Sequence, residues 1–95
     1  MFIVEPTYRA PLEVIDENLT DHRQFLDAQY ARNVFLASGP KAPRDGGIIL
    51  ASGRLSRSEL DDILAQDPFR LRGLAEYRVT EFTPAKTNNA MKGIL

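Results

Sequence analysis

The chain of 95 residues contains no cysteine and only one histidine. Without cysteine it has no disulfide framework, no thiolate metal site and no cysteine nucleophile. A single histidine without cysteine is also a poor ligand set for zinc, because such sites combine several histidine or cysteine side chains. We therefore expect no metal site.

Long hydrophobic runs and an excess of one charge are missing as well. The longest apolar runs are far shorter than the ~20 residues of a membrane-spanning helix. Twelve basic and thirteen acidic residues give a formal net charge of −1, with no strongly basic segment to neutralise nucleic-acid phosphates. The opening run Met1–Val4 is typical of a strand and lacks the basic-then-apolar order of a signal peptide. We expect a cytoplasmic protein that binds neither nucleic acid nor a membrane.

Motifs for common cofactors are absent from the one loop that contains adjacent glycines. The segment 38–47 has no phosphate-loop lysine and no dinucleotide glycine spacing, so we expect no cofactor. Gly46 and Gly47 permit either a positive φ or a tight contact with another chain. Ser38 and Arg44 could bind an anionic or hydroxylated ligand. The alternative is that the segment merely connects two strands.

The remaining composition, 43% hydrophobic and 26% charged, is that of an ordinary globular domain. At this length we expect one domain with one modest core. Four segments have the β-branched, aromatic or alternating pattern of strands: 2–8, 34–38, 48–51 and 76–82. Residues 12–17 and 69–73 are each predicted to form one short helical turn.

Two longer helices are predicted between these strands. The first spans Leu19–Asn33 and can be capped by Asn18 or Thr20. The second opens with a capping box, in which Ser56 is the cap and Glu59 follows three residues later, and ends before Pro68. The predicted buried faces are His22, Phe25, Leu26 and Gln29 in the first helix, and Leu60, Ile63 and Leu64 in the second.

The element order is therefore β-α-β-β-α-β, the ferredoxin-like split βαβ pattern of the α+β class. In this pattern a four-stranded antiparallel sheet carries both helices on one face. We expect the domain to span residues 1–84, followed by a more polar tail over residues 85–95.

The second face of that sheet is predicted to need a partner. Residues 48–51 are apolar on both faces, and the fourth strand has Tyr77 and Val79 on one side and Phe82 on the other. Left in water, this face would expose a larger apolar patch than monomers usually tolerate. A homodimer packed sheet to sheet across a two-fold axis would bury it, with the tail docked on the partner. The alternative is that the tail folds back over the same face.

His22 is the first candidate for chemistry. It lies in the first turn of its helix on the face toward the sheet, and both the helix N-terminus and burial favour a neutral ring. A neutral imidazole beside a carboxylate can act as a general base or proton shuttle. The alternative is a histidine at the edge of the core that donates to a backbone carbonyl.

Asp67 is the second candidate. It is predicted to end the second long helix, where the helix dipole opposes a negative charge. A histidine partner could compensate for that placement. The alternative is a turn aspartate that caps the backbone of Phe69 or Arg70.

Several short segments together resemble the YciI-like family of the dimeric α+β barrel superfamily. The resemblance extends from Phe2 to about Pro84. Its motifs are Asp21–Leu26, Phe35–Pro40, Gly46–Gly47, Asp67–Phe69 and Glu81–Phe82. It implies a ferredoxin-like dimer with a pocket beside the sheet, where the histidine and the Asp-Pro aspartate form a catalytic pair. In this chain these residues are His22 and Asp67. A dehydrochlorinase acting on chlorinated hydroxyquinols looks like a member, and related barrels include muconolactone isomerases and cofactor-independent monooxygenases.

Two functions of different kinds follow from these observations. The first is a cofactor-independent enzyme that transfers protons, by elimination, dehydrochlorination or isomerisation, on a small cyclic or aromatic molecule. His22 would move the proton and Asp67 would fix its tautomer, and the substrate-binding residues would be Ser38, Arg44, Tyr8 and Phe69. The second is a non-catalytic ligand-binding or accessory module that uses the same pocket or the dimer surface.

Overall fold

Four strands form one antiparallel sheet in the computed structural model, which describes residues 1–95. They are β1 (Phe2–Tyr8), β2 (Phe35–Pro40), β3 (Gly47–Ala51) and β4 (Ala75–Glu81), in the order β2-β3-β1-β4. Strand β1 lies in the centre and pairs with β3 and β4. This topology confirms the predicted ferredoxin-like α+β fold.

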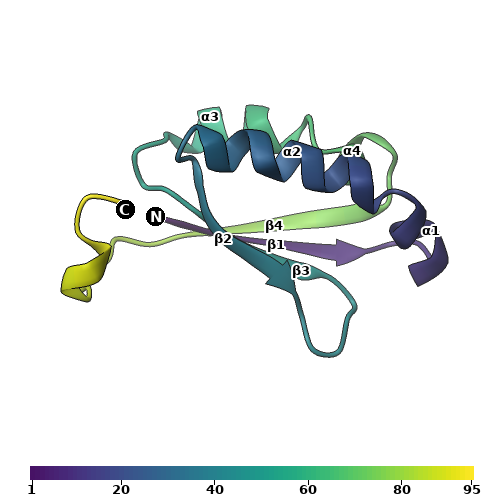
Figure 1. Ribbon diagram of the computed structural model, residues 1–95, viewed down its shortest axis with the longest axis horizontal. Helices are drawn as coiled ribbons and strands as arrows, with labels where there is room; N and C mark the ends of the chain where they lie inside the picture. The colour runs from purple at the N-terminus through teal and green to yellow at the C-terminus, as the bar shows by residue number, and fades with distance from the viewer.

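Three helices, α2 (Leu19–Ala31), α3 (Arg57–Leu64) and α4 (Pro68–Leu71), lie on one side of the sheet (Figure 1). A fourth, α1 (Leu12–Glu17), lies beyond the end of β1, and a short 3₁₀ helix, η1 (Asn89–Met91), lies in the tail. None of them has the length and hydrophobicity required to cross a membrane.

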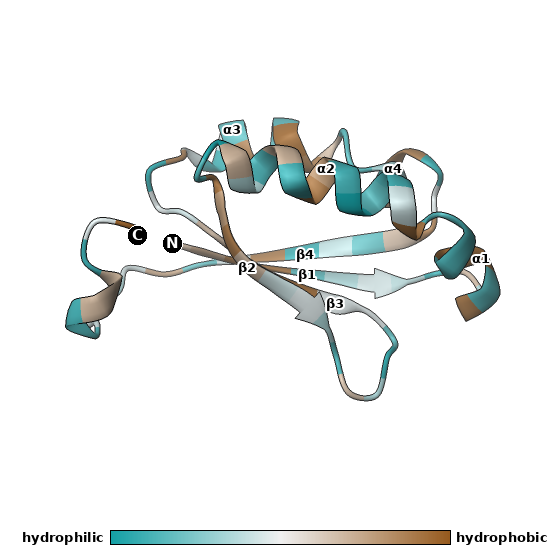
Figure 2. Cartoon of the chain, viewed as in Figure 1, coloured by the Kyte–Doolittle hydropathy of each residue, from teal (hydrophilic) through white to brown (hydrophobic).

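The main core lies between the sheet and α3. Phe2 and Val4 of β1 and Ile49 of β3 point toward the helices, and each is at most 2% exposed. The stripe on α3 is buried as predicted, and Leu60 is fully buried. Burying a side chain of this size contributes about 1.5–3 kcal/mol. Figure 2 shows the contrast between hydrophobic residues where β2 begins and the more hydrophilic outer side of α2.

A smaller core cluster lies at the other end of the sheet, where α1 and α4 meet β4. It consists of Ile15, Phe69 and Ala75, all buried. Tyr8, Leu19 and Tyr77 pack against it. This cluster supports the residues from which the candidate site is built.

The predicted start of α3 is confirmed and its predicted end is wrong. Ser56 Oγ accepts from the Glu59 backbone at 3.1 Å, and the Glu59 carboxylate accepts from the Ser56 backbone at 3.0 Å, which is a complete capping box. However, α3 ends at Leu64, and Asp67 is the N-cap of α4. Proline is favoured at the first position of a helix, so Pro68 begins a new helix as well as ending the old one.

The predicted start of α2 is correct in position, with Asn18 at the N-cap, but the expected capping bond is absent. Asn18 is its N-cap residue but makes no capping bond with its side chain, and Thr20 lies inside the helix. The Asn18 amide instead donates to the Val14 carbonyl at 2.8 Å, and its oxygen accepts from Arg72 at 2.6 Å. The side chain thereby connects α1, α2 and the end of α4. At its other end α2 stops at Ala31, shortly before Asn33 with its positive φ of 57°.

Strand β2 contains a register shift. Phe35 pairs with Ala51, whereas Ala37 pairs with Leu50 and Ser38 with Ile49. The strand therefore has one more residue than its partner between Phe35 and Ala37, which is a β-bulge. Beyond it, Ser38 lies on the same face of the sheet as Ile49, toward the helices.

The second face of the sheet carries no helix. Ile3 and Leu50 are register partners on this face and are partly exposed. The tail does not fold back over them: it leads away beyond the end of the sheet where the N-terminus lies (Figure 1). Its Gly93 carbonyl accepts from Arg54, in the loop after β3. The alternative in which the tail covers this face is therefore wrong, and both the homodimer and the docking of the tail on a partner stay predictions.

Gly46 supports the fold through a close backbone contact. A Cβ atom at this position would lie 2.1 Å from the Pro6 carbonyl oxygen, whereas one at Gly39 would meet nothing within 4 Å. The close contact at Gly46 is with β1 of the same chain, a contact with another chain stays a prediction, and neither Gly46 nor Gly47 has a positive φ.

We expect Gly46→Ala to lower the free energy of unfolding by about 1–3 kcal/mol, the usual cost of forcing atoms into a packed site. Gly39→Ala is the matched control and should change it by less than about 0.5 kcal/mol in urea unfolding.

Candidate active site

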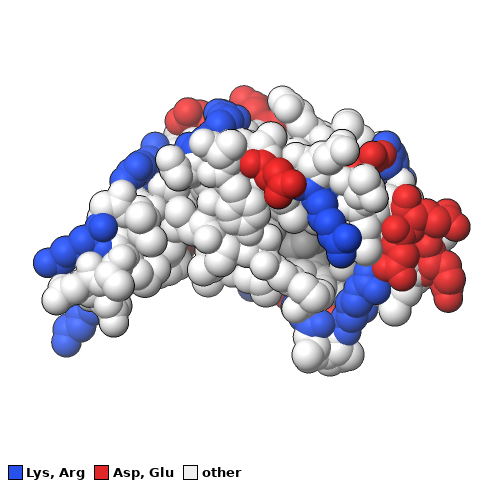
Figure 3. Space-filling model, viewed as in Figure 1, with Lys and Arg blue, Asp and Glu red and all other residues white.

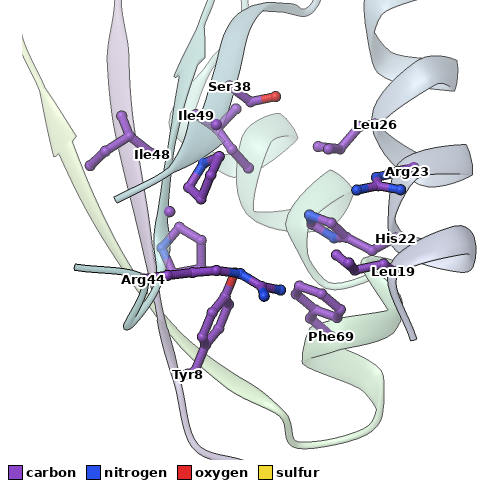
Figure 4. Close-up of a pocket in the computed structure, with 14 residues that line it drawn as sticks. Tyr8, Leu19, His22, Arg23, Leu26, Ser38, Arg44, Ile48, Ile49 and Phe69 are labelled. Atoms are coloured by element: carbon purple, nitrogen blue, oxygen red, sulfur yellow. The ribbon is translucent and has the colours of Figure 1, made fainter. Parts of the chain in front are cut away.

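A pocket of about 350 Å³ opens between α2 and the β2–β3 edge of the sheet (Figure 4). Its walls come from α2, from the ends of β1, β2 and β3, from the loop between β2 and β3, and from α4. Five of the six residues predicted for the site line this pocket: Tyr8, His22, Ser38, Arg44 and Phe69. Asp67 does not line it and lies behind His22, to which it is hydrogen-bonded.

His22 is held on two sides. Its Nδ1 lies 2.8 Å from Asp67 Oδ1, and its ring stacks on Phe69 with centroids 3.9 Å apart and planes 3° apart. The side chain is 12% exposed, so it remains accessible from the pocket. The partner of the ring is a carboxylate, so the alternative in which His22 donates to a backbone carbonyl is wrong. With Nδ1 engaged, Nε2 is the ring nitrogen available to a ligand.

Asp67 is fully buried, with 0% exposure. Its Oδ1 accepts from His22 and from the Phe69 backbone, the latter at 3.0 Å, and its Oδ2 accepts from the Tyr77 hydroxyl. Both sequence interpretations are therefore correct, since Asp67 caps a turn and also meets His22. Asp67 begins α4 instead of ending α3, so the predicted opposition between its charge and the dipole of the longer helix is wrong.

Tyr77 was missed as a site residue by sequence reasoning. It lies on β4 and was placed only among the apolar positions of the sheet. Burial raises the pKa of its hydroxyl far above the usual range, and the adjacent Asp67 charge adds to this effect. The hydroxyl therefore stays protonated and donates. No local signal marks this role, because the contact depends on how α4 sits over β4.

Arg44 and Ser38 lie on the sheet side of the pocket. The Arg44 guanidinium lies 5.9 Å from the Tyr8 ring centroid and donates to Asp16 of α1. That hydrogen bond raises the pKa of Arg44, so its charge is permanent. The Ser38 hydroxyl bonds the Tyr30 hydroxyl of α2. Both predicted polar residues are therefore in place, and each already has a protein partner.

The pocket is electropositive. Arg23 and Arg44 line it, and no acidic side chain does. Figure 3 shows a hollow flanked by basic side chains, with an acidic patch farther along at the α1 end, where Glu13, Asp16 and Glu17 lie. No three histidine, cysteine, aspartate or glutamate side chains cluster to hold a metal ion. The arrangement suits a small ligand with an anionic or hydroxyl group, and it has one basic nitrogen at the wall.

Comparison with known proteins agrees with the motifs and the fold. A family model described as the YCII-related domain matches residues 1–83. The chain belongs to the YCII-related family.

One solved structure with the same fold is 5-chloro-2-hydroxyhydroquinone dehydrochlorinase (TftG) from Burkholderia phenoliruptrix AC1100, in complex with 2,5-dihydroxybenzoquinone. The two chains are 20% identical with a TM-score of 0.70, and the match covers 87% of this chain and 94% of that one. At this identity the likeness establishes the fold. A search of curated proteins found no match.

The buried tyrosine predicts how stability depends on alkaline pH. The raised pKa of Tyr77 means that the folded chain keeps this proton above pH ~10, where a tyrosine in the unfolded chain loses it. The unfolded state then binds fewer protons than the native state, so Tyr77 lowers the stability by up to about 1.4 kcal/mol per pH unit above that point. We expect urea unfolding between pH 8 and 11 to show a weaker decline in Tyr77→Phe than in the unchanged protein. Equal slopes would contradict this assignment.

Proposed function

We propose that the protein is a cofactor-independent enzyme that carries out acid–base proton transfer on a small cyclic or aromatic molecule. The reaction would be an elimination, such as dehydrochlorination, or an isomerisation. The supporting observation is a histidine whose Nδ1 is held by a fully buried carboxylate while its ring lines a pocket of about 350 Å³. Membership of the YCII-related family adds to it.

In this proposal His22 Nε2 takes a proton from the substrate. Asp67 stabilises the resulting imidazolium through Nδ1, and the stacked Phe69 ring keeps the imidazole plane fixed. In an elimination, the electrons of the broken C–H bond form a double bond, and the leaving group departs with the electron pair of the bond that joined it to carbon. In an isomerisation, His22 returns the proton to another atom of the substrate.

The pocket indicates the size and charge of the substrate. Its volume of about 350 Å³ is near the lower end of the ~300–1,000 Å³ range of ligand sites, which suits one ring with small substituents. Leu26, Ile49 and Phe69 provide apolar walls, and Arg44 can pair with an oxyanion that forms as the proton leaves. Acid–base help of this kind contributes about 10²–10⁴-fold, so the substrate proton must already be fairly acidic. Hydroxylated six-membered rings, the ligand class named for TftG, meet these requirements.

Replacement of His22 tests the proposed base. We expect His22→Gln to lower kcat about 10²–10⁴-fold on an active hydroxylated or chlorinated hydroquinone, while ligand affinity changes little. Gln24→Ala, on the exposed part of the same helix, is the control and should leave kcat unchanged. Turnover retained in His22→Gln would rule His22 out as the base. A protein that binds such rings in calorimetry but converts none of them would instead be a binding module.

Asp16 is expected to compete with an anionic ligand for Arg44, because both would use the same guanidinium. We predict that Arg44→Met weakens benzoate binding, and that Asp16→Asn strengthens it about two- to fivefold, the scale of an exposed ion pair. Uncharged benzamide, measured in the same calorimetric titrations, should bind all three proteins alike. Benzoate affinity that is insensitive to both substitutions would exclude Arg44 as the anion-binding residue.

A further inference from the structure

The buried carboxylate of Asp67 has two oxygens with unequal surroundings. Oδ1 accepts from His22 Nδ1 and from the Phe69 backbone. Oδ2 accepts from one group only, the hydroxyl of Tyr77. The side chain has no exposure through which water could replace this donor.

The ring of Tyr77 is fixed by its surroundings on β4. It packs against both core clusters, is the register partner of Pro6, and has the Arg70 guanidinium 5.8 Å from its ring centroid. A hydroxyl held in this way presents one donor to Oδ2 in a constant position. It is also uncharged, so it does not compete with His22 as a second cation would.

Removal of this donor would leave a buried negative charge with one oxygen unpaired. That state is costly, so the carboxylate would turn toward other donors. The bond to His22 Nδ1 would then lose its alignment and, with it, the charge assistance that roughly doubles the strength of a hydrogen bond. The ring would be released from the tautomer in which Nδ1 carries the proton and Nε2 is free to accept one.

From these contacts we infer that Tyr77 is a positioning residue: by holding the Asp67 carboxylate in place as an acceptor, it fixes His22 in the tautomer with a basic Nε2 at the pocket wall. The inference rests on the proposed function only in treating Nε2 as the reacting atom. It adds a third residue, from a different element, to the histidine and the aspartate.

The test is nitrogen-15 NMR of the imidazole, which distinguishes the two neutral tautomers. His22 is the only histidine, so its two ring signals are unambiguous. We expect the Nδ1–H form to dominate in the unchanged protein, and its ratio to the Nε2–H form to fall about three- to tenfold in Tyr77→Phe, the scale of one hydrogen bond. Tyr30→Phe is the control: it also removes a tyrosine hydroxyl, the one bonded to Ser38, and should leave the ratio unchanged. An unchanged ratio in folded Tyr77→Phe overturns the inference.

A second variant serves if Tyr77→Phe fails to fold. The chain has three tyrosines, so Tyr77 is the only one left in the double variant Tyr8→Phe, Tyr30→Phe, and 3-fluorotyrosine labelling of that variant is site-specific. The fluorine makes the hydroxyl more acidic without removing it. The Nδ1–H proton signal of His22 should then move relative to the unlabelled double variant, and an unmoved signal overturns the inference. Failure of the proposed function would appear in a different measurement. The protein would then convert no substrate, while the tautomer ratio of His22 would still change in Tyr77→Phe.

Discussion

The buried charge of Asp67 is the constraint on which the site and its surroundings depend. An isolated carboxylate without access to water is costly, so it must be surrounded by donors. Here they come from α2, α4 and β4, through His22, the Phe69 backbone and Tyr77. No buried polar side-chain atom is left without a partner. Because the donors belong to three different elements, the carboxylate fixes how two helices sit over the strand.

The neighbouring contacts reinforce this arrangement. Arg72, just after α4, donates to Asn18 and to Asp21 at the start of α2. These bonds hold the two helix ends together on the outside, while Asp67 and His22 hold them on the inside. The stacked pair of His22 and Phe69 lies between. The pocket wall is therefore rigid where the proposed base lies, and its more exposed residues, such as Arg44 and Ser38, are on the opposite side.

The sequence was sufficient for the elements and for most of the site because those signals are local. The capping box at Ser56, the stripe on α3 and the strand patterns each depend on residues close together in the chain. The motifs that carry the family resemblance located His22 and Asp67, and their contact is present. The position of Asp67 at the start of α4 also has a local signal, because it caps the Phe69 backbone and Pro68 follows it. What could not be predicted depends on tertiary placement: Asn18 bonded to Arg72, and Tyr77 beneath the carboxylate. In both cases the partner lies on another element and is set by how the elements pack.

The bulge in β2 shows how backbone register can determine the chemistry of a surface. Side chains alternate along a regular strand, so Ser38, three residues after Phe35, would in such a strand face away from the helices. The bulge takes up the extra residue between Phe35 and Ala37 and keeps Ser38 opposite Ile49, on the side of the pocket. Substitution scans would not detect this dependence, because no single side chain carries it. Within this fold, the formation or loss of one bulge in the edge strand is thus a short evolutionary route to a pocket with different polarity.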